Sequence, residues 1–567
     1  MSKDYHPETI IRLTAMALAA VGFALRLYAL GSESLWFDEL LQLDIAQQSL
    51  STFLPELRHY AAAPLDYIIS HFWIGLGRGD VWVRLPAVVV GTLTLPLAYQ
   101  LGRQLLGRSA GPSLGLVLMA LLAFSPFHVR YSQETRPYAL VVLGVTLTAY
   151  ALWQLRRTGR WQYIVPLQVG VLIFSLAHLF ATVIFAPLLV FITADWLVSR
   201  PRNHGTMTLL ALLGTGAVAL IILLSMGWAS AFYYSTREFG KAVVEPEKFT
   251  VEAAEKPNQG TGPQVGWTLI QKDILGPLGA GDSATSLWLF NGIAGLGLFY
   301  LLVEGRYRLS LLLVLWLSLP IMLIVAFLVF RGTFFASRYI IATLPAYLIL
   351  LAAGLLALPR WLRCAQPRWL SFGAFLLLAG LVWADLTGEL QQLYREHTNE
   401  DWRLVALFLR QNAGPDDAIL AVNTEFTLNW YYPPVTAAAN TFDTLEAVQN
   451  SVARAERSWV ILSFFSTFLE DEFLKIRAWL SEQGAVQLRL DPVITVYYLG
   501  HNVPPPQLLE EIRSFALPPD HALYASLARE NRRNPAVARR YYELAIEIAP
   551  DEETRAAYRA ALELLVR

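Results

Sequence analysis

The sequence predicts a polytopic α-helical membrane protein that carries a smaller α/β domain toward its C-terminal end. Of its 567 residues, 55% are hydrophobic and only 16% are charged, whereas soluble domains carry roughly 25% charged residues. Apolar runs of membrane-spanning length recur as far as about residue 390. Beyond residue 399, short β-rich runs alternate with helical patterns, which is typical of an α/β domain.

Composition also excludes some classes of partner and site. The formal net charge of −1 argues against nucleic acid as a partner. Cys364 is the only cysteine, so the chain can form neither an intramolecular disulfide nor a cysteine-based zinc site.

About eleven apolar runs are long enough to cross a bilayer. The first, Ile10 to Leu30, follows a short polar N-terminus and is expected to be an uncleaved first helix. The run 64–76 is too short to cross, so we expect it to lie flat at the interface or to re-enter, within an outer loop with interfacial helices at 31–80. The remaining runs lie at about 81–101, 111–129, 137–155, 161–178, 179–198, 207–229, 284–303, 309–330, 338–358 and 370–388.

The positive-inside rule orients these runs. With the N-terminus in the cytoplasm, every predicted inner loop is basic; one carries Arg156, Arg157 and Arg160, for example. We therefore expect an integral protein of the plasma (inner) membrane, with the C-terminal domain outside. The polar segment 229–283 would also lie outside, as a lid or an acceptor-side loop.

Three domains are expected: a transmembrane domain at 1–392, an extracytoplasmic α/β domain at 393–502 and a helical tail at 503–567. The α/β domain should contain strands at 418–422, 459–463, 486–490 and 494–499, and helices at 402–412, 442–457 and 470–483. In the tail, Ala538, Tyr542, Ala545 and Pro550 match the second half of a tetratricopeptide repeat. A single helical hairpin is the simpler interpretation.

A carboxylate pair, Asp38 and Glu39, follows Trp36 and Phe37 in the loop after the first helix. Such a pair at a membrane surface suits a general base that works on a lipid-held substrate. The structural alternative is an acid that starts an interfacial helix, with the aromatic residues as headgroup anchors.

The charged residues of the helices cluster at the expected outer ends, not at mid-depth. Arginines together with Glu134 would there meet a lipid phosphate, whereas ion-coupled transporters tend to place ionisable groups near the midplane. The alternative for any single arginine is a helix-end anchor. This set is Arg26, Arg84, Arg130, Glu134, Arg136, His178, Arg331, Arg338 and Asp385.

The order of these motifs resembles the GT-C superfamily of integral-membrane glycosyltransferases. Within it, the sequence is most similar to the protein O-mannosyltransferases and the aminoarabinose transferases of lipid A. The resemblance covers residues 10 to about 390. It is carried by Trp36-Phe37-Asp38-Glu39, Pro64-Leu65-Asp66-Tyr67, Arg84-Leu85-Pro86, the segment Ser125 to Leu140 with Gln133-Glu134-Thr135-Arg136-Pro137-Tyr138, and Arg338-Tyr339.

The resemblance implies an inverting transfer from a polyprenyl-phosphate-linked sugar to a glycan, lipid or protein hydroxyl on the outer face. It places the catalytic acid at Asp38, with Glu39 beside it and Glu134 in the second outer loop. Its motifs also offer substrate-binding candidates: Arg84, Arg136 and Arg338 for the lipid phosphate, with His128, Tyr131, Tyr138 and Tyr339. Many relatives have His-Pro-Pro where this chain has Ala62-Ala63-Pro64, so His59 is the candidate to replace that histidine.

No cofactor is assigned, and no metal ligands are assigned. A divalent metal between Asp38 and Glu134 is compatible with the resemblance, although no Asp-x-Asp pair supports it. Two other functions remain open: a polyprenyl-lipid flippase or transporter, which does not need Asp38 at the surface, and a non-catalytic membrane scaffold, which needs neither the acids nor the arginines.

Overall fold

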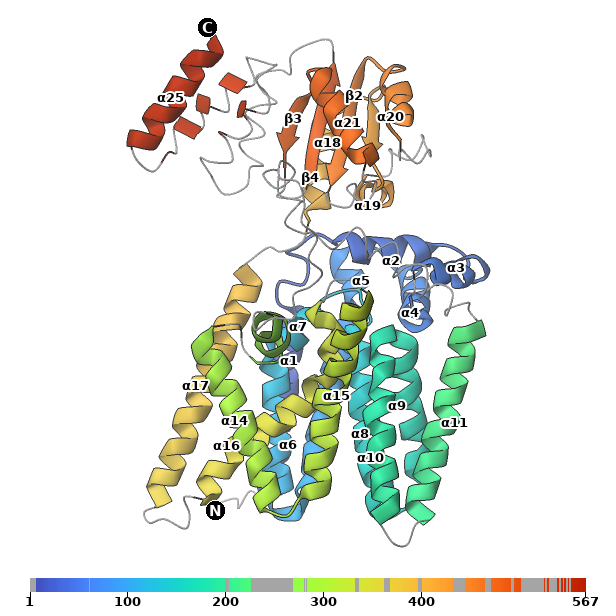
Figure 1. Cartoon of the computed structure of the whole chain (residues 1–567), viewed down its shortest axis with the longest axis vertical. Coiled ribbons are helices and arrows are strands. Elements are labelled where there is room, and N and C mark those ends of the chain that lie inside the picture. The colour runs from blue at the N-terminus through green and yellow to red at the C-terminus, as the bar shows by residue number, and fades with distance from the viewer. Residues whose placement is uncertain are drawn as a thin grey trace, which may run out of the picture. The chain divides into compact units, whose positions relative to one another are not determined.

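The computed structural model divides the chain into two compact units (Figure 1). The first contains residues 1–32, 45–244 and 258–397, and the second contains 33–44, 245–257 and 398–567. The structure describes residues 7–60, 62–198, 203–225, 269–279, 281, 283–331, 336–361, 368–395, 400–432, 444–463, 471–490, 494–500 and 552–566, with scattered residues between 525 and 549.

The first unit is a bundle of helices. Its α-helices are α1 (Pro7–Leu27), α3 (Leu50–Glu56), α4 (Pro64–Ile74), α5 (Asp80–Leu105), α6 (Gly107–Phe124), α7 (Pro126–Tyr131), α8 (Tyr138–Thr158), α9 (Ile164–Ala177), α10 (Phe185–Val198), α11 (Asn203–Ser225), α13 (Gly276–Leu278), α14 (Ala284–Val303), α15 (Tyr307–Arg331), α16 (Leu344–Trp361) and α17 (Arg368–Arg395). The segments η1 (Leu57–Tyr60), η2 (Trp161–Tyr163), η3 (Leu179–Ile184) and η7 (Ser337–Thr343) are 3-10 helices, and η6 (Leu269–Leu275) is a π-helix.

The helical elements confirm the predicted fold class. Among the described residues, nine helices are long and apolar enough to cross a membrane, and two shorter apolar helices cover Ala110–Phe124 and Trp161–Ala177. Together these elements coincide with the apolar runs expected from the sequence. Helix α4 has 11 residues, which is about 16 Å at 1.5 Å per residue and well short of a hydrocarbon core of about 30 Å. Its length agrees with an interfacial position.

Two breaks interrupt apolar stretches that the sequence predicts to be continuous or adjoining. The run 111–129 ends as helix α6 at Phe124, because Pro126 disfavours helical backbone at Ser125, which is extended. Ser125 then caps a new short helix, α7, by accepting a hydrogen bond from the His128 backbone. The second break is His178, whose extended backbone separates α9 from η3.

Glycines let helices α14 and α16 approach closely. A Cβ atom on Gly297 would lie 2.7 Å from the backbone nitrogen of Gly354, and one on Gly354 would lie 2.8 Å from the carbonyl carbon of Ile293. Real Cβ atoms do not come this close to backbone. Small residues at such crossings are typical of helix packing in membranes, where van der Waals contact replaces the hydrophobic effect between helices.

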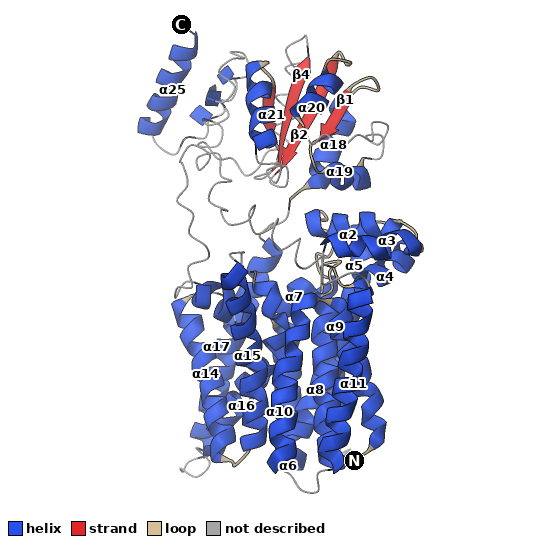
Figure 2. Cartoon of the chain, turned by 45° about the vertical axis from the view of Figure 1, so that its right-hand side comes forward, coloured by secondary structure: helices blue, strands red, loops and turns tan. Residues whose placement is uncertain are grey.

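The second unit is built on a four-stranded mixed sheet in the order β1-β2-β4-β3 (Figure 2). Strands β1 and β2 are parallel, and the other two neighbouring pairs are antiparallel. The predicted strands and the helix 402–412 are confirmed to within two residues. The elements are the start of α2 (Phe37–Gln47), α18 (Trp402–Asn412), β1 (Ala418–Ala421), α19 (Glu425–Tyr431), α20 (Leu445–Val452), β2 (Arg457–Ser463), α21 (Asp471–Glu482), β3 (Val486–Arg489), β4 (Ile494–Gly500) and α25 (Glu552–Val566).

Strand β2 is buried on both faces because helices cover both sides of the sheet. Its residues Val460 and Leu462 pack with α20 and α21, whereas the alternate residue Trp459 contacts Phe408 of α18 and Tyr498 of β4. Alternation with a period of two sends successive side chains to opposite faces. The unit therefore has three layers, with α18 on one face of the sheet.

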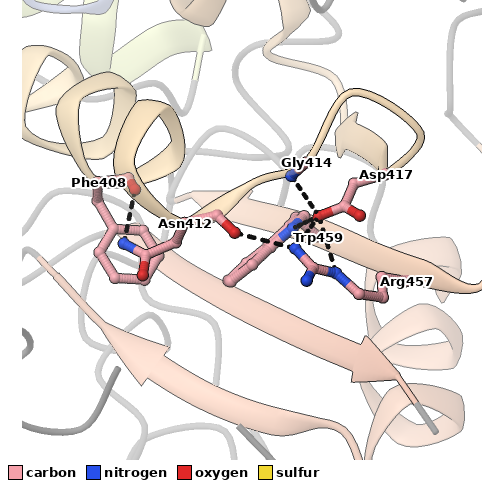
Figure 3. A network of polar contacts seen from close by, with 6 residues as sticks. All are labelled: Phe408, Asn412, Gly414, Asp417, Arg457 and Trp459. Carbon is pink, nitrogen blue, oxygen red and sulfur yellow. Dashed lines mark hydrogen bonds and ion pairs between the residues drawn. The ribbon is translucent and has the colours of Figure 1, made fainter. Parts of the chain in front are cut away.

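Asp417 ties α18 to the sheet (Figure 3). Its Oδ2 accepts hydrogen bonds from Gly414 N at 2.9 Å, Trp459 Nε1 at 2.8 Å, and Arg457 Nε and Nη2 at 3.1 and 2.6 Å. Arg457 Nη2 also donates to the carbonyl of Asn412, at the end of α18. Burial opposes the charged carboxylate, but these donors outweigh it and hold the pKa of Asp417 below its usual value.

The tail and the long loop are only partly described. Ala538, Tyr542 and Ala545 are buried, as small and aromatic positions of a helical hairpin would be. Pro550 lies outside the described residues. So does most of the loop expected at 229–283, and the prediction that it forms a lid remains a prediction.

Candidate functional site

The segment between α6 and α8 carries the motif around Glu134. Two buried side chains, Arg26 and His128, connect this segment to helix α1. Arg26 and His128 are both fully buried, and Arg26 Nη2 lies 2.7 Å from His128 Nδ1. Because an arginine can only donate, Nδ1 must be the acceptor. The guanidinium also donates to the carbonyls of Gly22, Leu122 and Ala123. Arg26 thus joins helix α1 to the end of α6 and to α7.

This arrangement gives His128 a supporting position. An imidazole whose Nδ1 accepts is neutral and carries its proton on Nε2. That Nε2 is buried and has no hydrogen-bond partner within the described part of the chain. His128 is among the residues expected to bind substrate. In the structure its side chain is completely buried and bonded to Arg26, so it helps to hold the loop in place.

The turn after α7 is fixed to α1 and α5. Gln133 Nε2 donates to the carbonyls of Arg26 and Tyr28, at 3.0 and 2.8 Å. Ser132 Oγ donates to the carbonyl of His128 at 2.6 Å. A Cβ on Gly91 of helix α5 would lie 2.7 Å from Ser132 Cβ. The turn can therefore pack this closely against α5 only because residue 91 has no side chain.

Glu134 follows this turn and is 5% exposed. One of its carboxylate oxygens lies 3.5 Å from Nε of Arg130, which is partly exposed. The Tyr131 ring packs edge-on against the ring of Tyr138, with centroids 4.7 Å apart. Burial and the Glu134 carboxylate raise the pKa of the Tyr131 hydroxyl, so this hydroxyl stays protonated and can donate a hydrogen bond.

A row of rings connects this loop to segments far along the chain. The His178 ring lies 5.4 Å from the Tyr138 ring and 6.2 Å from the Tyr339 ring. Phe180 also contacts Tyr339, at 4.5 Å between centroids. Helices α8, η3 and η7 each contribute to this row, which we call the aromatic row (Tyr131, Tyr138, His178, Phe180 and Tyr339).

Two arginines that are far apart in the sequence lie in segments that carry the aromatic row. Arg136 precedes Tyr138 by two residues, and Arg338 directly precedes Tyr339. The Arg338 guanidinium carbon lies 6.0 Å from the centre of the Tyr339 ring. The structure therefore brings together five of the residues expected to form the site: Tyr131, Arg136, Tyr138, Arg338 and Tyr339.

Arg84 is placed differently. It is 3% exposed, and its Nη1 donates to the carbonyl of Leu30 at 2.9 Å. Through Nη1, Arg84 therefore holds the backbone of the segment that follows α1. The side chain of His59 lies outside the described residues. In the same region, His71 Nδ1 lies 2.8 Å from the carbonyl of Ala46.

Asp38 and Glu39 belong to the second unit, in the first turn of helix α2. The Asp38 side chain is half-buried, whereas Glu39 is fully buried. Glu39 Oε2 accepts a hydrogen bond from Trp36 N at 3.3 Å. This bond uses Glu39 to cap the start of α2, which is the structural role that the sequence left open. Within the described residues, no group of three or more His, Cys, Asp or Glu side chains is placed to hold a metal ion.

Comparison with known proteins gives a family model that matches part of the chain and solved structures with a similar fold. A family model described as dolichyl-phosphate-mannose-protein mannosyltransferase matches residues 63–228. No curated protein sequence matches the chain. Among solved structures, ArnT from Cupriavidus metallidurans bound to undecaprenyl phosphate is similar, with a TM-score of 0.50 and 15% identity, over 87% of this chain and 99% of that chain.

A second fold match is the archaeal oligosaccharyltransferase AglB from Archaeoglobus fulgidus, in complex with an inhibitory peptide and a dolichol-phosphate. Its TM-score is 0.51 with 11% identity, over 98% of this chain and 86% of that chain. The Archaeoglobus fulgidus oligosaccharyltransferase tethered to an acceptor peptide has a TM-score of 0.52 with 10% identity, over 82% and 72% of the two chains. The chain therefore shares its fold with these structures, and the family model matches a part of it, residues 63–228.

Three groups of residues that hold the candidate segments in place receive no specific role from the sequence alone. His178 was noted only as a polar residue near a helix end, although its position between two apolar runs could have marked it as a break. Arg26 carried no motif. Glu400 and Tyr431, which bind the segment before Asp38, gave no local signal because their partners lie more than 360 residues away.

Proposed function

We propose that this protein is an inverting glycosyltransferase of the GT-C superfamily. It moves a sugar from a polyprenyl-phosphate donor to the hydroxyl of a glycan, lipid or protein acceptor on the outer face of the plasma (inner) membrane. Its N-terminus would be cytoplasmic, as the basic inner loops indicate.

One observation carries the proposal: Arg136 and Arg338 are about two hundred residues apart in sequence, yet they lie in the two segments whose tyrosines, Tyr138 and Tyr339, both contact the His178 ring. Arginine forks suit a phosphate because they donate two parallel hydrogen bonds to its oxygens. The protonated Tyr131 hydroxyl adds a donor without adding a competing negative charge. The observed binding of undecaprenyl phosphate by ArnT and of dolichol-phosphate by AglB supports the same class of ligand here.

The reaction needs one base and one set of cations. The acceptor oxygen bonds to the anomeric carbon from the face opposite the phosphate, while the bond from that carbon to the phosphate oxygen breaks. The proton of the acceptor hydroxyl passes to a carboxylate, for which we assign Asp38. The bond electrons leave with the polyprenyl phosphate, whose added negative charge Arg136 and Arg338 stabilise.

The other acidic residues receive secondary roles. Glu39 caps the helix that carries Asp38, so it orients the base. Glu134 pairs with Arg130 at 3.5 Å, which suits a role in orienting the loop or the acceptor. Arg84 is a further phosphate candidate. Whether a divalent metal assists is left to experiment, through the dependence of the rate on added chelator.

The test is transfer from a radiolabelled polyprenyl-phosphate sugar by the purified full chain in detergent and in proteoliposomes. Asp38→Asn should lower the initial rate by roughly 10²–10⁴-fold and leave the protein folded. Glu56→Gln, an isosteric change on helix α3, should leave the rate unchanged.

Near wild-type turnover by Asp38→Asn would remove Asp38 as the base. Absence of transfer and of donor hydrolysis in the wild type, with movement of labelled lipid across proteoliposomes, would replace the transferase with a flippase. Absence of both activities would favour the scaffold.

A further inference from the structure

The segment that leads into Asp38 is held by residues of the α/β fold far along the chain. Leu35 is fully buried, and its backbone N–H donates to the Tyr431 hydroxyl at 2.8 Å. Ser34 is also buried; its Oγ accepts from the Arg403 backbone at 3.3 Å and lies 3.4 Å from the same tyrosine oxygen. A single hydroxyl thus anchors two consecutive residues before the helix.

The start of helix α2 is capped from the same region. The first backbone N–H groups of a helix have no partner within it, and Trp36 has no side-chain oxygen to serve as a cap. Instead, Glu400 Oε2 accepts from the Phe37 N–H at 3.0 Å. The Phe37 ring packs edge-on against Phe426 of α19, with centroids 5.1 Å apart.

Both neighbours of Asp38 are therefore fixed. Phe37, which precedes it, is held by Glu400 and Phe426, and Glu39, which follows it, is fully buried and bonded to Trp36 N. We propose that the α/β unit sets the conformation of the Asp38 turn, with Tyr431 and Glu400 as positioning residues for the base. This inference rests on the proposed function only in taking Asp38 as the base.

The chemistry explains why such positioning would matter. A catalytic group works only when it is held within about 0.5 Å of its productive place, and a half-buried aspartate at a helix start that no other residue held would sample many positions. Loosening the turn reduces the fraction of molecules whose Asp38 is in place. It does not change the arginines assigned to the lipid phosphate, so kcat should fall while KM for the donor stays constant.

The chain offers matched variants. Tyr431→Phe deletes one oxygen, and Tyr432→Phe deletes the adjacent hydroxyl, which makes no hydrogen bond within the described part of the chain. Glu400→Ala removes the acceptor for Phe37 N–H, whereas Glu400→Gln keeps a carbonyl oxygen that can accept it. Two readouts are taken on the full chain: kcat and KM for a polyprenyl-phosphate sugar, and hydrogen exchange of the amides in residues 33–40.

Loss of one backbone hydrogen bond should speed exchange in this segment by roughly two- to tenfold. We expect this for Tyr431→Phe and Glu400→Ala, with a loss of kcat of similar size and an unchanged KM. Tyr432→Phe should match the wild type, and Glu400→Gln should recover most of the loss.

Faster exchange with unchanged kcat would overturn the positioning role, and so would a loss of kcat without faster exchange. Equal behaviour of Tyr431→Phe and Tyr432→Phe would overturn it as well. The exchange measurement does not depend on activity. If Asp38→Asn stays active while exchange responds as expected, the assignment of the base fails but the contact of the α/β fold with this turn stands.

Discussion

Replacing Gly91 with alanine should damage turnover more than stability, because of what the new side chain meets. A Cβ at this position would lie 2.7 Å from Ser132 Cβ and nearer still to Ser132 Oγ, and 3.2 Å from Arg26 Nε. Ordinary contacts begin near 3.4 Å. Ser132 cannot simply rotate away, since its hydroxyl is bonded to the His128 carbonyl.

The turn must therefore move by roughly 1 Å, because close-packed interiors leave no void to absorb the methyl group. Overpacking of this kind costs about 1–3 kcal/mol, while alanine in place of glycine returns up to about 1 kcal/mol of helix propensity. The net loss of stability is then about 0–3 kcal/mol. A 1 Å displacement next to Tyr131 and Glu134 should cost turnover on the order of a hundredfold.

The assay is the initial rate of sugar transfer per folded molecule, with thermal unfolding in detergent measured alongside. Two glycines serve as controls. Gly102→Ala, also on α5, would clash with the Gly115 backbone at 2.7 Å, so it should destabilise the protein without the same loss of turnover. Gly295→Ala meets nothing within 4 Å and should be neutral or stabilising. If Gly91→Ala loses no more turnover than Gly102→Ala, the close contact between Ser132 and helix α5 does not matter for function.

Three further outcomes are expected. Arg136→Lys should weaken donor binding and turnover by about ten- to a hundredfold, since lysine keeps the charge but loses the fork; unchanged kinetics would make Arg136 a helix-end anchor. The lowered pKa of Asp417 means that its stabilisation is complete above the ordinary value near 3.8 and is lost as the pH falls through the folded value, so the stability gap between wild type and Asp417→Asn should close in acid; a gap independent of pH would contradict this. On a Cys364→Ser background, Ser32→Cys should react with an impermeant thiol reagent from outside and Thr158→Cys only from inside, and the reverse pattern would invert the topology.

The sequence could predict what depends on local periodicity. Membrane spans and the strands at 418–421 and 494–500 were placed within a few residues because hydrophobic runs and alternation act over short windows. It could not predict the order β1-β2-β4-β3, nor the mixture of parallel and antiparallel pairs, because strand pairing is decided by contacts across the whole domain.

The candidate site also contains residues that local motifs predict and residues that only the tertiary structure reveals. Motifs identified Arg136 and Arg338, but the contacts of His178 with the Tyr138 and Tyr339 rings follow only from the packing of α8, η3 and η7. The pair of Arg26 and His128 joins residues 102 apart in sequence, and a buried arginine of this kind looks like a helix-end anchor until its acceptors are known.

The acceptors also separate the arginines by what they can do. Arg26 shares its two terminal nitrogens among three carbonyls and an imidazole nitrogen and is fully buried, so its charge is used to join helices. Arg84 donates with Nη1 to the Leu30 carbonyl, so part of its fork also holds the backbone. Arg136 and Arg338 instead lie in the segments that carry Tyr138 and Tyr339, and the Arg338 guanidinium carbon lies 6.0 Å from the centre of the Tyr339 ring. Lysine keeps the charge of arginine but loses the planar fork that suits a phosphate. Lysine substitution should therefore impair donor binding most at Arg136 and Arg338, less at Arg84, and at Arg26 should act through stability alone.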